Sequence, residues 1–246
     1  GEIIYGLTSN KSSGNIILAN DLQVQENLTM TAGNISTSSN ILTLGQNTTT
    51  IGVLTHTSGT IVGKLERWLN ATAIDYLFPL GTAADYRPAT VRFNNLTSGS
   101  AIGEFISSDP GDNGLIPLND GGQDIHNSYT EGYWTLTPAN GLSSSDYDLD
   151  LTGTGMTSYT IDASTRLLTR ANSGVDWTAD GSHQAAVSPV VSRNNITTLA
   201  GEYALGDTTN CTPPVTSVIT GNSDTCTNTV GLTYSVTNNA GNTYLW

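Results

Sequence analysis

The chain has 246 residues, of which 8 are Lys or Arg and 21 are Asp or Glu, so its formal net charge is −13. Charged residues make up 12% of the chain, against roughly 25% in an average globular protein. The acidic balance argues against a nucleic-acid-binding protein, which needs clustered cations, and against docking on an anionic membrane. The sequence contains no run of 18 or more apolar residues, so it predicts no membrane insertion.

Turn-forming and β-forming residues dominate the composition. Glycine, serine, threonine and asparagine supply 111 of the 246 residues. The best helical spacing of apolar residues, at 64–69, lasts barely two turns, whereas alternation of apolar and polar residues recurs along the chain. The sequence therefore predicts an all-β protein.

Residues 1–63 carry a degenerate repeat with a period near 20 residues. Gly14-Asn15-Ile16 returns as Gly33-Asn34-Ile35 and again as Gly59-Thr60-Ile61, and Leu22-x-Val24 returns as Leu42-x-Leu44. This spacing is typical of a β-solenoid, in which each coil buries its apolar residues against its neighbours. Asparagines at a fixed place in each coil can form a hydrogen-bonded ladder, and glycines allow tight corners. The alternative is an irregular meander of a Thr-rich sandwich.

From residue 64 to residue 207 the aromatic residues become denser and turn signals separate short apolar stretches, which indicates a β-sandwich. Trp134 and Trp177 are expected to anchor its core or its edge. Strands are expected at Gly103–Ser107, Gly132–Thr137, Tyr147–Leu151, Arg166–Arg170, Ala185–Val191 and Gly201–Leu205.

Residues 208–214 have the composition of a linker, and residues 215–246 follow it with about three short apolar stretches. So few strands cannot close a sandwich of their own. The sequence therefore predicts the incomplete start of a further domain and a natural polypeptide that is longer. Trp246 is expected to belong to the core of that domain.

Four segments, 76–82, 86–91, 132–136 and 201–206, together with the Gly-Asn-Ile repeats, resemble large secreted surface proteins of Bacteroidota. Residues 219–246 are similar to the opening of the PKD-like, immunoglobulin-type repeats of those proteins. The resemblance implies export by the type IX system, a cell-surface or extracellular location, and a role in adhesion or in a surface layer. The expected fold is all-β: a short β-solenoid, a β-sandwich and the start of an Ig/PKD-like sandwich.

No pattern of catalytic residues stands out. The histidines, His56, His126 and His183, are far apart in the sequence, which contains neither His-Glu-x-x-His nor Gly-x-Ser-x-Gly. The expected solenoid carries three acidic residues and no clustered pair that could cleave a glycosidic bond. We therefore expect a protein that is not an enzyme and binds no cofactor other than a structural calcium ion.

Two acidic patterns are candidates for that calcium. One places oxygen ligands in a turn, and the other places three carboxylates on one face of a strand. Calcium takes six to eight oxygens and suits such arrangements, although a solvated turn and a solvated strand face explain them equally. The candidate ligands are Asp109, Asp112 and Asn113 in the turn, and Asp146, Asp148 and Asp150 on the strand.

Cys211 and Cys226 flank a stretch of 14 residues. In an exported protein a disulfide between them would stabilise the fold by roughly 3 kcal/mol. The alternative is that Cys226 pairs with a cysteine beyond residue 246.

Two functions follow from these patterns. The first is a structural or adhesive module of an exported multi-domain surface or filament protein, with further copies or neighbouring surface proteins as partners, because open strand edges invite association. The second is a glycan-binding module of a secreted carbohydrate-active enzyme. Exposed rings would favour the second function, and the candidates are Trp68, Tyr129, Tyr133 and Trp177.

Overall fold

A computed structural model describes residues 1–116, 118–199 and 201–208, which belong to one compact unit. These residues form 18 strands and no helix, which confirms the all-β prediction. The chain from residue 209 onward lies outside the described residues. The expected linker after Thr208, the expected Ig/PKD-like start at 215–246 and both cysteines therefore fall outside them.

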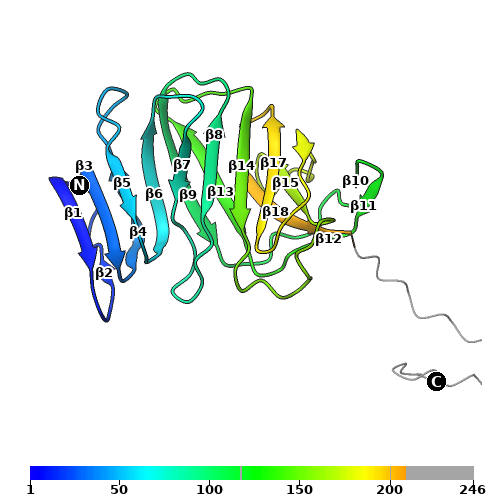
Figure 1. The fold of residues 1–246 in the computed structure, drawn as a ribbon, viewed down its shortest axis with the longest axis horizontal. Coiled ribbons are helices and arrows are strands. Elements are labelled where there is room, and N and C mark those ends of the chain that lie inside the picture. The colour runs from blue at the N-terminus through cyan, green and yellow to red at the C-terminus, as the bar shows by residue number, and fades with distance from the viewer. Residues whose placement is uncertain (117, 200, 209–246) are drawn as a thin grey trace, which may run out of the picture. The chain divides into compact units, whose positions relative to one another are not determined.

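The first six strands form a β-solenoid of about three turns (Figure 1). Its coils stack in the register that the repeat predicts: Ile16 pairs with Ile35, which pairs with Ile61. Likewise, Leu22 pairs with Leu42 in parallel strands. The six strands are β1 (Glu2–Asn10), β2 (Ile16–Ile17), β3 (Leu22–Ala32), β4 (Ile35–Leu44), β5 (Val53–His56) and β6 (Ile61–Leu69).

Glycine and asparagine shape the coils. Gly33 and Gly59 occupy equivalent corners with φ of 80° and 95°, and a Cβ on Gly59 would overlap the carbonyl oxygen of Gly33. Asn34 accepts a hydrogen bond from the backbone N–H of Thr60 at 2.9 Å, and Asn40 donates to the carbonyl of Leu18 at 3.0 Å. These asparagines join neighbouring coils by bonding to backbone groups.

Strand β6 joins the solenoid to the sandwich. It pairs in parallel with β4 and antiparallel with β9 (Gly99–Ile106), so the expected boundary between residues 63 and 64 falls inside a shared strand. The resulting 11-stranded sheet runs in the order β1-β3-β4-β6-β9-β13-β18-β12, with β15 also on β18, β2 on β4 and β5 on β3. The added strands are β12 (Asn127–Ser128), β13 (Tyr133–Ala139), β15 (Arg166–Arg170) and β18 (Glu202–Asp207).

The second layer is a five-stranded antiparallel sheet in the order β16-β17-β14-β8-β7. The core between the layers is aromatic. The rings of Trp134 and Phe105 meet edge to face with their centres 5.1 Å apart, and the Trp134 indole N–H donates to the Arg87 carbonyl at 2.7 Å. Burying each such ring contributes roughly 1.5–3 kcal/mol. The strands of this sheet are β7 (Asp75–Phe78), β8 (Ala89–Phe93), β14 (Tyr147–Thr152), β16 (Ser182–His183) and β17 (Val190–Ile196). A separate two-stranded sheet is formed by the hairpin of β10 (Leu118–Asp120) and β11 (Gln123–Ile125).

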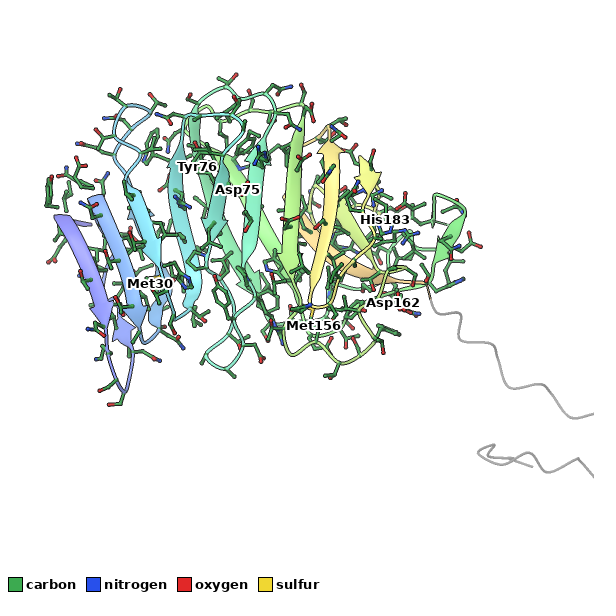
Figure 2. All side chains as sticks on the ribbon, viewed as in Figure 1. Met30, Asp75, Tyr76, Met156, Asp162 and His183 are labelled. Atoms are coloured by element: carbon green, nitrogen blue, oxygen red, sulfur yellow. The ribbon has the colours of Figure 1, made fainter. Side chains whose placement is uncertain are left out.

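A buried cation marks the junction between the two parts. Arg67 pairs with Leu44, the last aliphatic residue of a solenoid ladder, and its guanidinium lies 5.7 Å from the ring centre of Tyr76 (Figure 2) and 5.9 Å from that of Phe78. Burial lowers the pKa of Arg67 to about 10, against the opposing influence of Tyr76. The aromatic second layer therefore covers the end of the aliphatic solenoid core.

The strand expected at 185–191 is wrong in position. Val187 and Val190 exchange backbone hydrogen bonds of 3.0 and 2.8 Å around Ser188-Pro189, so a tight turn occupies the middle of the expected strand. Proline has no N–H for a sheet ladder, which is why the strand begins after it, as β17.

Candidate functional site

Ladders of apolar residues at equivalent positions of successive coils build the solenoid core. Ile4 pairs with Val24, which pairs with Leu44. Val24 and Leu44 are fully buried, whereas Ile4 packs against the core but stays partly exposed. Leu7 is partly exposed in the same way, although its partner Leu28 is fully buried. Within the described chain the first coil has a neighbouring coil on one side, whereas the next coil has one on both sides, which accounts for the difference in burial.

Strand β1 is also an open edge. It has nine residues, EIIYGLTSN, with one charge at Glu2, and within the described chain its one strand partner is β3. The side chains of Ile3 and Tyr5 are 60% and 70% exposed, and Ile17 of the same coil is 69% exposed. A long, nearly uncharged edge with exposed apolar side chains is a template for another strand.

The opposite edge of the same sheet is closed. Thr169 on β15 exchanges two backbone hydrogen bonds of 2.9 Å with Thr178. The neighbouring Trp177 is 1% exposed, and the Arg170 guanidinium lies 3.9 Å from its ring centre. The indole donates to the Gly111 carbonyl at 2.8 Å. This ring belongs to a second small core on the outer side of the sheet, with Leu115, Ile125, Leu168 and Ala204.

Asp120, from the β10–β11 hairpin, anchors this closed edge. Both Nη atoms of Arg193, which is fully buried, donate to its carboxylate at 2.9 Å. The Nε of Arg166 lies 3.1 Å from the same carboxylate. Burial lowers the pKa of Arg166, and the charge of Asp120 opposes that shift. Arg193 also donates to the Leu167 carbonyl on β15, so the carboxylate ties the hairpin to two strands.

His183, labelled in Figure 2, contacts Arg166 of this network. Its Nε2 is 2.9 Å from Nη1 of Arg166, and its Nδ1 is buried without a hydrogen-bond partner. Burial first, and then the charge of Arg166, lower the pKa of His183. The ring is therefore held neutral as part of the closed edge.

A groove of about 360 Å³ lies on the outer face of the solenoid sheet. Gln23, Thr43 and Glu66 occupy one cross-strand row of it, because Gln23 pairs with Thr43 and Thr43 pairs with Glu66. Trp68 is partly exposed and lies two residues further along β6, on the same face. Asn140, from the turn after β13, also lines the groove.

Neutral donors hold the Glu66 carboxylate in place. Thr43 Oγ1 donates to it at 3.0 Å, Ser100 Oγ at 2.6 Å and Asn140 Nδ2 at 3.0 Å. The turn with positive φ at Asn140 and Gly141, of 50° and 84°, brings the amide back over the sheet. Sequence reasoning missed Glu66. Its one signal was the alternation of residues 64, 66 and 68 with buried Leu65 and Leu69.

The first calcium candidate lies in the loop that covers Trp177. The Asp112 carboxylate accepts from the backbone N–H and the hydroxyl of Ser128 at 2.6 and 2.8 Å. Asp109 accepts from a backbone N–H two residues on at 2.8 Å, and the carbonyl of Asn113 accepts from Trp177 at 2.9 Å. These groups fasten the loop to β12 and to the backbone of Trp177.

The second candidate lies at β14. Asp148 and Asp150 share one face of the strand, with buried Leu149 between them, whereas Asp146 lies just before β14 instead of on the strand as expected. Asn94 donates to Asp146 at 3.0 Å and to Asp148 at 3.3 Å, so an amide joins these two carboxylates, while Asp150 is exposed. Among the described residues no three His, Cys, Asp or Glu side chains form a group that could hold a metal ion. Calcium binding at either place stays a prediction.

The structure separates the four aromatic candidates for sugar stacking. Tyr129 is fully buried and Trp177 almost so, so these two candidates are excluded as stacking platforms. The expectation that Trp134 and Trp177 are core anchors is confirmed, in two separate clusters. Tyr133 is partly buried and packs against the second small core, which contains Trp177. Of the four candidates, Trp68 alone lines the groove over the solenoid sheet.

The other two histidines have structural partners. His56 stacks on Tyr86 with ring centres 5.1 Å apart, and its Nε2 is 2.8 Å from the Gly59 carbonyl. Burial raises the pKa of Tyr86 to about 12. His126 donates its backbone N–H to Asp207 at 2.9 Å.

No family model, no curated protein and no solved structure matches the chain. Within residues 1–208, apart from 117 and 200, there is no helix that is long and apolar enough to cross a membrane. Function is therefore inferred from the geometry of the chain itself.

Proposed function

We propose that this chain is a non-catalytic structural and adhesive module of an exported, multi-domain cell-surface or extracellular filament protein, and that it assembles through β1. The observation that carries the proposal is the nine-residue open edge, on which Ile3 and Tyr5 are exposed. An unpaired strand edge gains backbone hydrogen bonds when a second strand adds to it.

The partner that fits this edge is a second copy of the chain. In an antiparallel pair related by a two-fold axis, Ile4 of one copy lies opposite Leu7 of the other, and Leu7 opposite Ile4. Both side chains pack against the solenoid core but remain partly exposed in a single copy. With Glu2 as the one charge on the strand, little repulsion opposes the pairing despite the net charge of −13.

Surface location and adhesion are supported by the low content of charged residues and by the resemblance to exported surface proteins. A structural role is further supported at Glu66, whose carboxylate is held by three neutral donors. A carboxylate that accepts three hydrogen bonds is held in one orientation and acts as a hydrogen-bond acceptor.

Sedimentation velocity of the full chain at a series of concentrations tests the proposal. Tyr5→Lys places a charge on the open edge and should abolish association without changing the melting temperature. Val187→Lys is the matched control, because Val187 is 78% exposed and lies in the turn before β17, at a different sheet. This control should associate like the unmodified chain.

A chain that stays monomeric at all concentrations up to about 1 mM contradicts the proposal, since that range covers weak specific association. So does association that Tyr5→Lys leaves intact, or that Val187→Lys weakens equally.

A further inference from the structure

We propose that the groove over the solenoid sheet binds a short neutral oligosaccharide, one ring of which stacks on Trp68. The inference does not depend on self-association, because the groove lies on the outer face of the sheet, where Glu2 and Ile3 of β1 help to line it, whereas association uses the backbone edge of β1. It assigns a ligand class to the surface made by Gln23, Thr43, Glu66, Trp68 and Asn140.

The size and the aromatic residue of the groove fit a sugar ring. Its volume of about 360 Å³ lies at the lower end of the roughly 300–1,000 Å³ of small-molecule sites. Trp68 is partly exposed there, whereas Trp134 and Trp177 are 0% and 1% exposed. An indole face offers apolar surface to the C–H groups of a sugar ring while the hydroxyls of that ring point outward.

The polar groups beside Trp68 are fixed before any ligand arrives. Three donors orient the Glu66 carboxylate, and Asn140 donates to both Glu66 and Ser100, at 3.0 and 2.8 Å. Gln23 donates to the Gly45 carbonyl at 2.9 Å, which sets the direction of its amide. Groups that are already ordered lose little conformational entropy on binding.

The charge of the groove selects a neutral ligand. Its lining includes the acidic residues Glu2, Asp21 and Glu66 and no lysine or arginine side chain. Anionic chains such as uronates or nucleic acids would be repelled. Sugar hydroxyls, by contrast, donate hydrogen bonds that carboxylate and amide oxygens accept.

The test uses the full chain on an array of neutral oligosaccharides of glucose, mannose, galactose and xylose, with oligogalacturonate and single-stranded DNA as anionic probes. The best neutral probe is then titrated by calorimetry. Trp68→Ala should weaken its binding roughly ten-fold or more, and Trp68→Phe should weaken it less because a ring is retained. Val187→Ala is the control, since Val187 is 78% exposed and does not line the groove.

Far-ultraviolet circular dichroism checks the fold of each variant, and Gln23→Ala replaces Trp68→Ala should the latter unfold. Binding that is lost in Trp68→Ala, reduced in Trp68→Phe or Gln23→Ala, and kept in Val187→Ala supports the proposal. Any of three results overturns it: no neutral probe bound at about 10 mM, binding unchanged in Trp68→Ala and Gln23→Ala, or tighter binding of an anionic probe.

Discussion

The two edges of the large sheet differ in how far other parts of the described chain cover them. At β15, the backbone of Thr178, the ring of Trp177 and the guanidinium of Arg193 cover the last strand. At β1, the last strand carries exposed Ile3 and Tyr5 and has β3 as its one strand partner in the part of the chain described. Natural sheets normally protect their edges. In the described chain, buried charges close one edge of the sheet, and β1 at the other edge keeps a free side to which the proposed partner strand would add.

The closed edge also requires long-range contacts that the open edge does not. Asp120 on β10 and Arg193 on β17 are 73 residues apart in the sequence and meet only in the folded chain. The open edge, by contrast, is built from a local repeat. In this chain, the closed edge of the sheet depends on contacts between distant residues, whereas the open edge depends on a local repeat.

The largest loss of stability is expected from a substitution that disrupts the closed edge. Asp120→Ala leaves Arg193 and Arg166 buried without their carboxylate, which should lower the free energy of unfolding by about 3–5 kcal/mol. Asp75→Ala is the control, because its ion pair with Arg92 is exposed and should be worth about 0–1 kcal/mol. Urea denaturation of both variants measures the difference; equal losses would show that the network does not hold this edge.

A smaller effect is expected at the solenoid corner. Gly59→Ala places a Cβ against the Gly33 carbonyl oxygen at φ 95°, which the stacked coils cannot relieve. Gly122→Ala, in the β10–β11 hairpin at φ 84°, meets nothing within 4 Å and should show the backbone penalty alone, about 1–2 kcal/mol. Gly59→Ala should cost about 1–3 kcal/mol more. Thermal melts of the two variants measure this difference, and equal melting temperatures for Gly59→Ala and Gly122→Ala would contradict tight stacking of the coils.

The smallest effect is a pH dependence at the closed edge. The pKa of His183 is lowered in the folded state, so in the unfolded state the ring binds a proton more readily. The stability that its neutral form provides is complete above the unfolded pKa of about 6.5 and is lost as the pH falls below it. His183→Gln should therefore lose less stability between pH 7.5 and pH 5.5 than the unmodified chain, on the order of tenths of a kcal/mol. A larger loss in the variant contradicts this sign.

Local patterns predicted much of the fold, and distant pairs escaped prediction. The 20-residue repeat specifies its own partners, so the pairing of Ile16 with Ile35 could be read from the sequence. Strands with clear alternation, such as β14, were predicted within a residue. The groove could not be predicted, because Asn140 reaches Glu66 across 74 residues and through a turn. Trp177 was expected to be an anchor, but it also stayed a stacking candidate because nothing in the local sequence reveals the loop that covers it.

Hydrogen–deuterium exchange of the full chain, resolved by residue, tests the open edge most directly. In a parallel pair, alternate amides of β1 bond to β3 and the others face away. At low concentration we expect the outward amides of β1 to exchange quickly while Thr169, bonded to Thr178, stays protected. At high concentration the outward amides of β1 should become protected and β15 should not change. Outward amides of β1 that are protected at every concentration, or exposed at every concentration, would contradict the account.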